Sequence, residues 1–215
     1  MNMNSIKILL ASSALQLVFA HSAFAYTINL GGTSVAGQGI FSNVPGAIAT
    51  QDFNSSALLP SNYTGGKVVL GSLSGQFASP PNDSSRYYTV GGNAGTQGQV
   101  AFGFLASYFG FYGGSPDGYN GLELFNGATS VLSLTGAQIA SNAGVLANGN
   151  QNVGYYFNIT AAGPSEFFDR VVFKSTSAAF ETDNHAVLAA VPEQETYLMM
   201  IAGLGVMGAV ARRRE

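Results

Sequence analysis

The stretch QVAFGFLASYFGFY, residues 99–112, carries the strongest aromatic pattern of the chain. It is rich in aromatic residues, and glycine or serine recurs between the large apolar side chains. This pattern predicts two short β-strands, at Gln99–Phe104 and Ser107–Tyr112.

Comparable runs lie on both sides of this stretch. Asn126-Gly127 separates two of them and predicts a tight β-hairpin, because both residues tolerate the positive φ that such a turn requires. Only Thr135–Ala140 suggests a helical turn. Many short strands separated by Gly, Asn and Pro predict an all-β fold, an antiparallel β-sandwich of jelly-roll type. The further predicted strands are Lys67–Leu70, Gly121–Phe125, Ser130–Leu134, Tyr155–Ile159, Phe167–Lys174 and Ala186–Val191.

The composition narrows the class of protein. Charged residues make up 9% of the 215-residue chain, against roughly 25% in an average soluble protein, and the formal net charge is −3. Three of the eight basic residues stand together near the C-terminus, so no basic face for nucleic acid is expected. The chain has no cysteine, which excludes disulfides, cysteine nucleophiles and Cys-ligated metals.

Residues 1–25 have the pattern of a secretory signal peptide. Lys7 supplies a positive start, and the apolar run Ile8–Ala20 is too short to span a membrane as a helix. Ala23 and Ala25 form the small-x-small pattern that signal peptidase cleaves, which predicts a mature chain that starts at Tyr26.

Residues 191–215 combine three ordered parts. Val191-Pro192-Glu193 is followed by the uncharged run Thr196–Ala211, and Arg212-Arg213-Arg214 comes next. A helix over 197–211 is just short of spanning the inner membrane unless Tyr197 and the arginines reach the two interfaces, with the arginines on the cytoplasmic side. The alternative is an ordinary tail anchor.

This tail resembles the PEP-CTERM sorting signal of Gram-negative bacteria, whose carriers are processed by an exosortase. The motif of that family usually has a second proline, where this chain has Gln194. The resemblance implies recognition at Val191, Pro192 and Glu193, a transient stay in the inner membrane, and processing by an exosortase-like transpeptidase or protease.

The segment 26–190 is the predicted β-sandwich domain. It resembles one group of exosortase-dependent surface proteins through four stretches that occur in the same order. The group typically has Trp where Gly114 stands and Ile where Pro116 stands. The resemblance implies an exported β-sandwich and brings no established activity. The four stretches are 75–80, 109–120, 149–151 and 179–184.

Acidic and amide residues suggest a structural calcium site. Glu181, Asp183 and Asn184 are predicted to share one turn, and Asp117 and Asn120 lie in the predicted loop 113–121. Calcium binds oxygen ligands of this kind. The alternative is that these residues only form Asx turns and cap strand ends. Asp52 is considered as a distant ligand.

An aromatic patch suggests contact with sugars. Side chains alternate along a strand, so Phe109 and Phe111 share one face while Tyr108 and Tyr112 share the other. An outward tyrosine face, together with Tyr119, would allow Tyr108, Tyr112 and Tyr119 to stack on glycan rings. The alternative is that the phenylalanines fill the sandwich and the tyrosines cover its rim.

Catalysis has little support in the sequence. His185 is the only histidine outside the signal peptide, it is expected at a strand end, and no nucleophile-elbow motif is present in the domain. A glycosidase-like pair is conceivable among the carboxylates, yet chance placement explains them equally well. We therefore expect no enzyme. The carboxylates considered are Asp117, Glu123, Glu166 and Asp169.

Together these observations predict an exported protein of the cell surface or extracellular matrix. Its expected role is structural or adhesive in exopolysaccharide or biofilm, as the resemblance implies. The alternative is a carbohydrate-binding module or a weak glycan-active enzyme. Ice binding is remote, because no regular Thr-x-Thr array is present.

Overall fold

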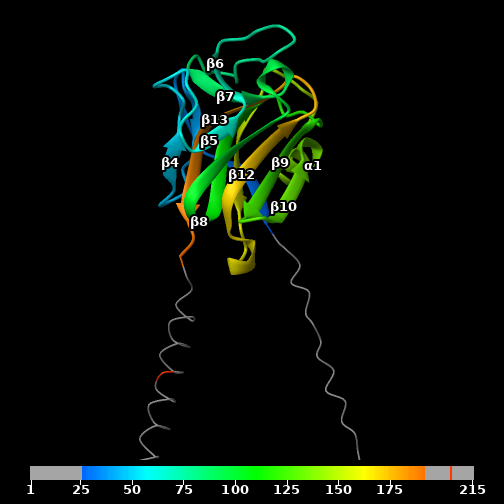
Figure 1. The fold of residues 1–215 in the computed structure, drawn as a ribbon. Helices are drawn as coiled ribbons and strands as arrows, with labels where there is room; N and C mark the ends of the chain where they lie inside the picture. The colour runs from blue at the N-terminus through cyan, green and yellow to red at the C-terminus, as the bar shows by residue number, and fades with distance from the viewer. Residues whose placement is uncertain (1–25, 192–203, 205–215) are drawn as a thin grey trace, which may run out of the picture.

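A computed structural model describes residues 26–191 and residue 204. Within them the named strands pair only in antiparallel fashion, and a single short α-helix, α1 (Gly136–Asn142), is present (Figure 1). The prediction of an all-β, antiparallel fold is therefore confirmed.

Thirteen strands make up this part of the chain. Eleven belong to one continuous sheet, and β2 and β3 form a separate hairpin. The strands are β1 (Thr27–Gly31), β2 (Thr33–Val35), β3 (Gly39–Phe41), β4 (Ile48–Gln51), β5 (Tyr63–Gly65), β6 (Lys67–Leu70), β7 (Arg86–Val90), β8 (Gln97–Gly114), β9 (Asn120–Asn126), β10 (Thr129–Thr135), β11 (Gly154–Thr160), β12 (Phe168–Ser175) and β13 (Phe180–Ala189).

Strand β8 connects two halves of the sheet, one that contains β5 and β12 and one that contains β11 and β13. Its first part pairs with β12 and β5, and its second part pairs with β11 and β13. The prediction of two separate strands over 99–112 is wrong, because the chain stays extended through all 18 residues. The register against β12 shifts between Ala101 and Ala106, where β8 passes from one set of partners to the other.

Aromatic rings join the two halves across the core. Phe109 and Phe111 of β8 lie 6.0 and 6.2 Å from the ring of Phe173 on β12. His185 of β13 stacks on the same ring at 5.1 Å. All four side chains are buried, so strands β8, β12 and β13 share one aromatic core.

Local sequence signals place several elements correctly. Strand β6 has the predicted bounds, and the hairpin between β9 and β10 turns at Gly127, with φ of 57°. The predicted helical turn is α1, which begins with a capping box between Thr135 and Gln138.

Strand β13 corrects two predictions. Glu181, Asp183 and Asn184 do not share a turn but lie within this strand, whose register against β8 shifts after Asp183. His185 is not at a strand end either. It is fully buried in the middle of β13, because the aromatic core surrounds it on both sides.

Within residues 26–191 and 204, no helix is long and apolar enough to cross a membrane. The predicted signal peptide, Pro192, Glu193, the predicted helix 197–211 and Arg212–Arg214 lie outside the described residues, apart from residue 204 of that helix. Val191 follows β13 and is exposed.

We predict that Gly98→Ala and Gly103→Ala, two identical changes in β8, have opposite effects. A Cβ at Gly98 would lie 1.8 Å from the buried Tyr88 hydroxyl, whereas a Cβ at Gly103 meets nothing within 4 Å. Overpacking should lower the free energy of unfolding of Gly98→Ala by about 1–3 kcal/mol. Gly103→Ala should raise it by about 0.5–1 kcal/mol, because alanine loses less backbone entropy on folding. Urea unfolding of the full chain measures both, and equal effects would contradict the packing described here.

Candidate functional site

A polar pocket of about 370 Å³ lies where four loops meet. This volume is within the roughly 300–1,000 Å³ typical of ligand sites. Residues 72–78, between β6 and β7, form one wall, and Ser115, Asp117 and Tyr119 form another. Gly149 and Gln151 close a third side, and Ala178, Ala179 and Glu181 complete the pocket.

Glu181 projects from β13 into this lining. Its Oε1 accepts a hydrogen bond from the backbone N–H of Ala78 at 2.8 Å. Its Oε2 is buried and has no hydrogen-bond partner among the described residues. Burial, helped by the charge of Asp117, raises the pKa of the Glu181 carboxyl to about 7.

Asp117 and Tyr119 form the opposite wall. The Tyr119 hydroxyl lies 2.8 Å from Asp117 Oδ2 and 3.0 Å from the carbonyl oxygen of Ala178. Burial raises the pKa of the Asp117 carboxyl as well. A Cβ at Gly149 would lie 2.5 Å from Asp117 Oδ1, so only glycine allows the third wall to approach this carboxylate.

The lining favours a neutral, polyhydroxylated ligand. Carboxyl, amide and hydroxyl groups face the pocket beside two half-buried aromatic rings, those of Phe77 and Tyr119. None of the described residues that line it is basic or a histidine, so an anionic ligand would lack a counter-charge. Hydrogen-bonding groups next to an aromatic edge are what a sugar requires.

The prediction that Tyr108 and Tyr112 form an exposed face is wrong. The alternation itself is confirmed, since the phenylalanines between them join the core cluster. However, the tyrosine face is covered as well, and the two side chains are 1% and 2% exposed. Tyr108 bonds Ser42 at 2.8 Å, and the Tyr112 hydroxyl donates to the carbonyl of Pro81. Of the three predicted glycan contacts, only Tyr119 lines the polar pocket, and Tyr112 borders a separate pocket of about 240 Å³.

The predicted calcium ligands are divided between two places. Glu181 belongs to the polar pocket, whereas Asp183 lies within hydrogen-bonding reach of Asp83. Asn120 is buried and bonds Ser175 instead. Within residues 26–191, no group of three or more histidine, aspartate or glutamate side chains is arranged to hold a metal ion.

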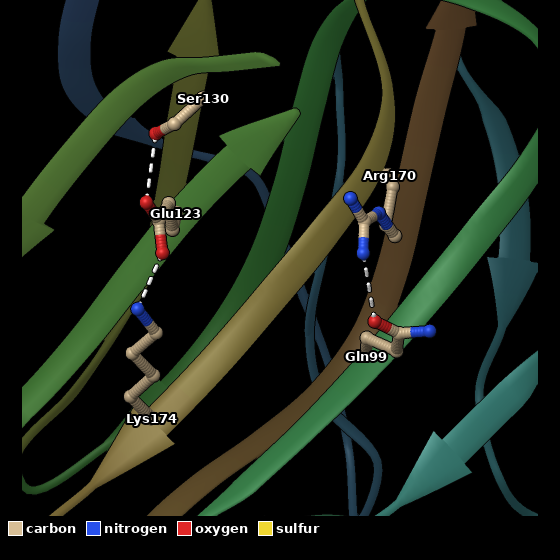
Figure 2. A network of polar contacts seen from close by, with 5 residues as sticks. All are labelled: Gln99, Glu123, Ser130, Arg170 and Lys174. Atoms are coloured by element: carbon tan, nitrogen blue, oxygen red, sulfur yellow. Dashed lines mark hydrogen bonds and ion pairs between the residues drawn. The ribbon is translucent and has the colours of Figure 1, made fainter. Parts of the chain in front are cut away.

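The carboxylates considered for catalysis are scattered. Figure 2 shows Glu123 between Ser130 and Lys174, with Arg170 pointing to Gln99. These contacts occupy Glu123 on the strand surface, away from the pocket lining.

The remaining candidates make local contacts of their own. Asp169 accepts from the backbone of Gly127 at 3.0 Å, and Glu166 accepts from the backbone of Ala162. His185 bonds Tyr63 at 2.8 Å and Thr182 at 3.0 Å, and burial lowers its pKa to about 3. Only Asp117 of the four carboxylates lines the pocket.

Sequence reasoning did not group the pocket residues, although it marked most of them. Each of the four stretches that carry the resemblance to surface proteins contributes to this one lining. The contributing residues are 75–78 of the first stretch, Ser115, Asp117 and Tyr119 of the second, Gly149 and Gln151 of the third, and Ala179 and Glu181 of the fourth. They are far apart in the chain, and the pairing of β7, β8, β11 and β13 brings them together.

No protein-family model matches the chain, and no curated protein matches it.

We predict that Glu181→Gln gains stability relative to the wild type as the pH rises. The folded wild type keeps a proton on Glu181 up to about pH 7, whereas the unfolded chain loses it near pH 4.5, so wild-type stability falls across this window. Glutamine does not titrate, so the difference in free energy of unfolding should grow by up to about 3 kcal/mol between about pH 5 and pH 8.

Glu123→Gln is the matched control. Lys174 lowers the pKa of Glu123, so this carboxylate is ionised in both states across that range. Its effect on stability, measured by urea unfolding at each pH, should change little. A parallel pH dependence for both variants would contradict the assignment to Glu181.

Proposed function

We propose that the chain is an exported protein of the cell surface or extracellular matrix that binds neutral polysaccharide through the polar pocket. The observation that carries the proposal is the convergence of four separate stretches on one lining. These stretches carry the resemblance to exosortase-dependent surface proteins, and they supply hydroxyl, amide and carboxyl groups beside Tyr119. The role that follows is adhesive, in exopolysaccharide or biofilm, without catalysis.

The position of the pocket suits a protein tethered by its ends. The described chain begins and ends at one end of the domain, and the loop between β6 and β7 lies at the opposite end (Figure 1). A ligand at that loop is therefore reached from the side away from Tyr26 and Val191.

The tails complete the proposal. Signal peptidase would cleave after Ala25, and the C-terminal helix would hold the jelly-roll-like sandwich at the inner membrane of a Gram-negative bacterium. An exosortase-like enzyme would then process the chain near Pro192 and Glu193 and release it to the surface. The composition supports this setting, because a surface with few charges and many Asn, Ser and Gly residues suits a hydrated polysaccharide layer.

We predict that Ser74→Trp abolishes binding to exopolysaccharide isolated from the producing cells. Ser74 is exposed on the pocket wall, and an indole there would fill space that the sugar needs. Ser55→Trp is the control, because Ser55 is exposed in a turn outside the pocket lining. Co-sedimentation with the insoluble polysaccharide measures both, with cellulose as a second matrix.

Retention of wild type and Ser55→Trp together with loss of Ser74→Trp supports the pocket. Equal retention of all three would place binding elsewhere on the protein. Failure of the wild type to sediment with any neutral polysaccharide of a broad panel would overturn the proposed function.

A further inference from the structure

Two buried aspartates, Asp83 and Asp183, lie close to Tyr112 and outside the polar pocket. Asp183 is 0% exposed and Asp83 is 7% exposed, and their carboxyl groups lie within hydrogen-bonding reach. The β8–β13 register sets Asp183 opposite Tyr112, and the hydroxyl of Tyr112 donates to Pro81, two residues before Asp83. Among the described residues the one ion pair joins Lys174 to Glu123, so no lysine or arginine neutralises the two aspartates.

In each aspartate, only one of the two carboxyl oxygens has a hydrogen-bond partner among the described residues. Asp83 Oδ1 accepts from the backbone N–H of Ser85 at 2.8 Å, and Asp183 Oδ1 accepts from that of Asn184 at 2.8 Å. The Oδ2 atom of each is buried and has no hydrogen-bond partner among the described residues. A buried carboxylate without a partner is costly, so a positive charge or a proton is required there.

Two side-chain amides also have an oxygen without a hydrogen-bond partner. Asn184 Oδ1 and Asn54 Oδ1 are buried and unpaired within the described chain. Gln38 ties their residues together: its carbonyl accepts from Asn184 Nδ2 at 2.6 Å, and its side-chain oxygen accepts from Asn54 Nδ2 at 3.4 Å. Gln38 also forms a β-bridge with Asp83. Both amides are thus fixed by their nitrogens, with their oxygens left over.

The backbone around this group is held in an uncommon conformation. Four non-glycine residues of the described chain have positive φ, and three of them adjoin or belong to this group: Phe53 at 53°, Asn82 at 59° and Asn184 at 50°. Such conformations persist where the surroundings enforce them. Asp52, considered from sequence as a distant ligand, lies near enough for its charge to raise the pKa of Asp183.

We propose that Asp83, Asp183, Asn54 and Asn184 bind a calcium ion. A proton shared between the two carboxyls would satisfy their Oδ2 atoms and leave both amide oxygens unpaired. Calcium takes six to eight oxygens and accepts mixed carboxylate and amide ligands in flexible geometry. Asp83 also lines a surface depression of about 480 Å³, which gives an ion and its remaining water ligands access from solvent. The ion would fasten the 36–39, 52–54 and 82–85 segments to β13.

The test is metal binding by the full chain, purified in detergent and freed of metal with a chelator. About 10 mM CaCl₂ should raise the Tm by about 3–10 °C, given the Kd of roughly 10⁻⁴–10⁻³ M typical of extracellular sites. Terbium should bind at the same place and luminesce on tyrosine excitation, because Tyr112 adjoins the site and the chain has no tryptophan.

Asp83→Asn and Asp183→Asn should each abolish the calcium shift and weaken terbium binding at least tenfold. Asparagine resembles a protonated aspartate, so both variants should fold without metal, and if one does not, the other decides. Asp169→Asn, which changes an aspartate on β12 bonded to Gly127, should keep both responses. No calcium shift in the wild type, or an equal shift in Asp83→Asn and Asp183→Asn, would overturn the proposal and leave a shared proton as the explanation.

Discussion

Strand β8 packs against both β12 and β13, and the other strands are arranged around this contact. A strand of 18 residues takes part in both halves of the sheet, and its phenylalanines meet Phe173 and His185 in one aromatic core. Burying these rings provides the main apolar driving force in a chain with few charges. Because β8 fixes the register of its neighbours, it also fixes which loops meet at each end of the sheet.

The two candidate sites follow from that register. Strand β13 carries Glu181 into the polar pocket and, two residues later on the same face, carries Asp183 to Asp83. Both carboxyls are buried within this strand, where apolar side chains would cost less free energy. Burial raises the pKa of both carboxyls. Polar groups kept at this cost are common at functional sites. The polar pocket would bind a ligand of the matrix. The calcium ion at the second site would fix the loops that surround that second site.

The sequence predicted what local patterns control. Alternation located β6, β9, β10 and β12, the Asn-Gly pair located the hairpin, and Thr135 with Gln138 located α1. Alternation also showed correctly that Tyr108 and Tyr112 share a face opposite the phenylalanines. It does not show whether a second segment covers that face, and here Ser42 and Pro81 do so.

Features that depend on contacts between residues far apart in the sequence could not be predicted. The polar run Glu181–Asn184 looked like a turn, because hydrophobic alternation stops there, yet pairing with β7 and β8 keeps it in a strand. The partnership of Asp183 with Asp83 spans 100 residues and has no local signature. The same holds for the pocket, whose four walls were each noticed in the sequence but were not brought together by it.

The most direct test of the account is the intact mass and C-terminal peptide map of the protein from native cells and medium, analysed separately. The account predicts a chain that starts at Tyr26, ends between Val191 and Glu195, and occurs at the cell surface or in the medium. Extra mass at that end would identify covalent attachment to a glycan or lipid. A chain that keeps Arg212–Arg214 and stays in the membrane fraction would contradict the account and make this a tail-anchored periplasmic protein.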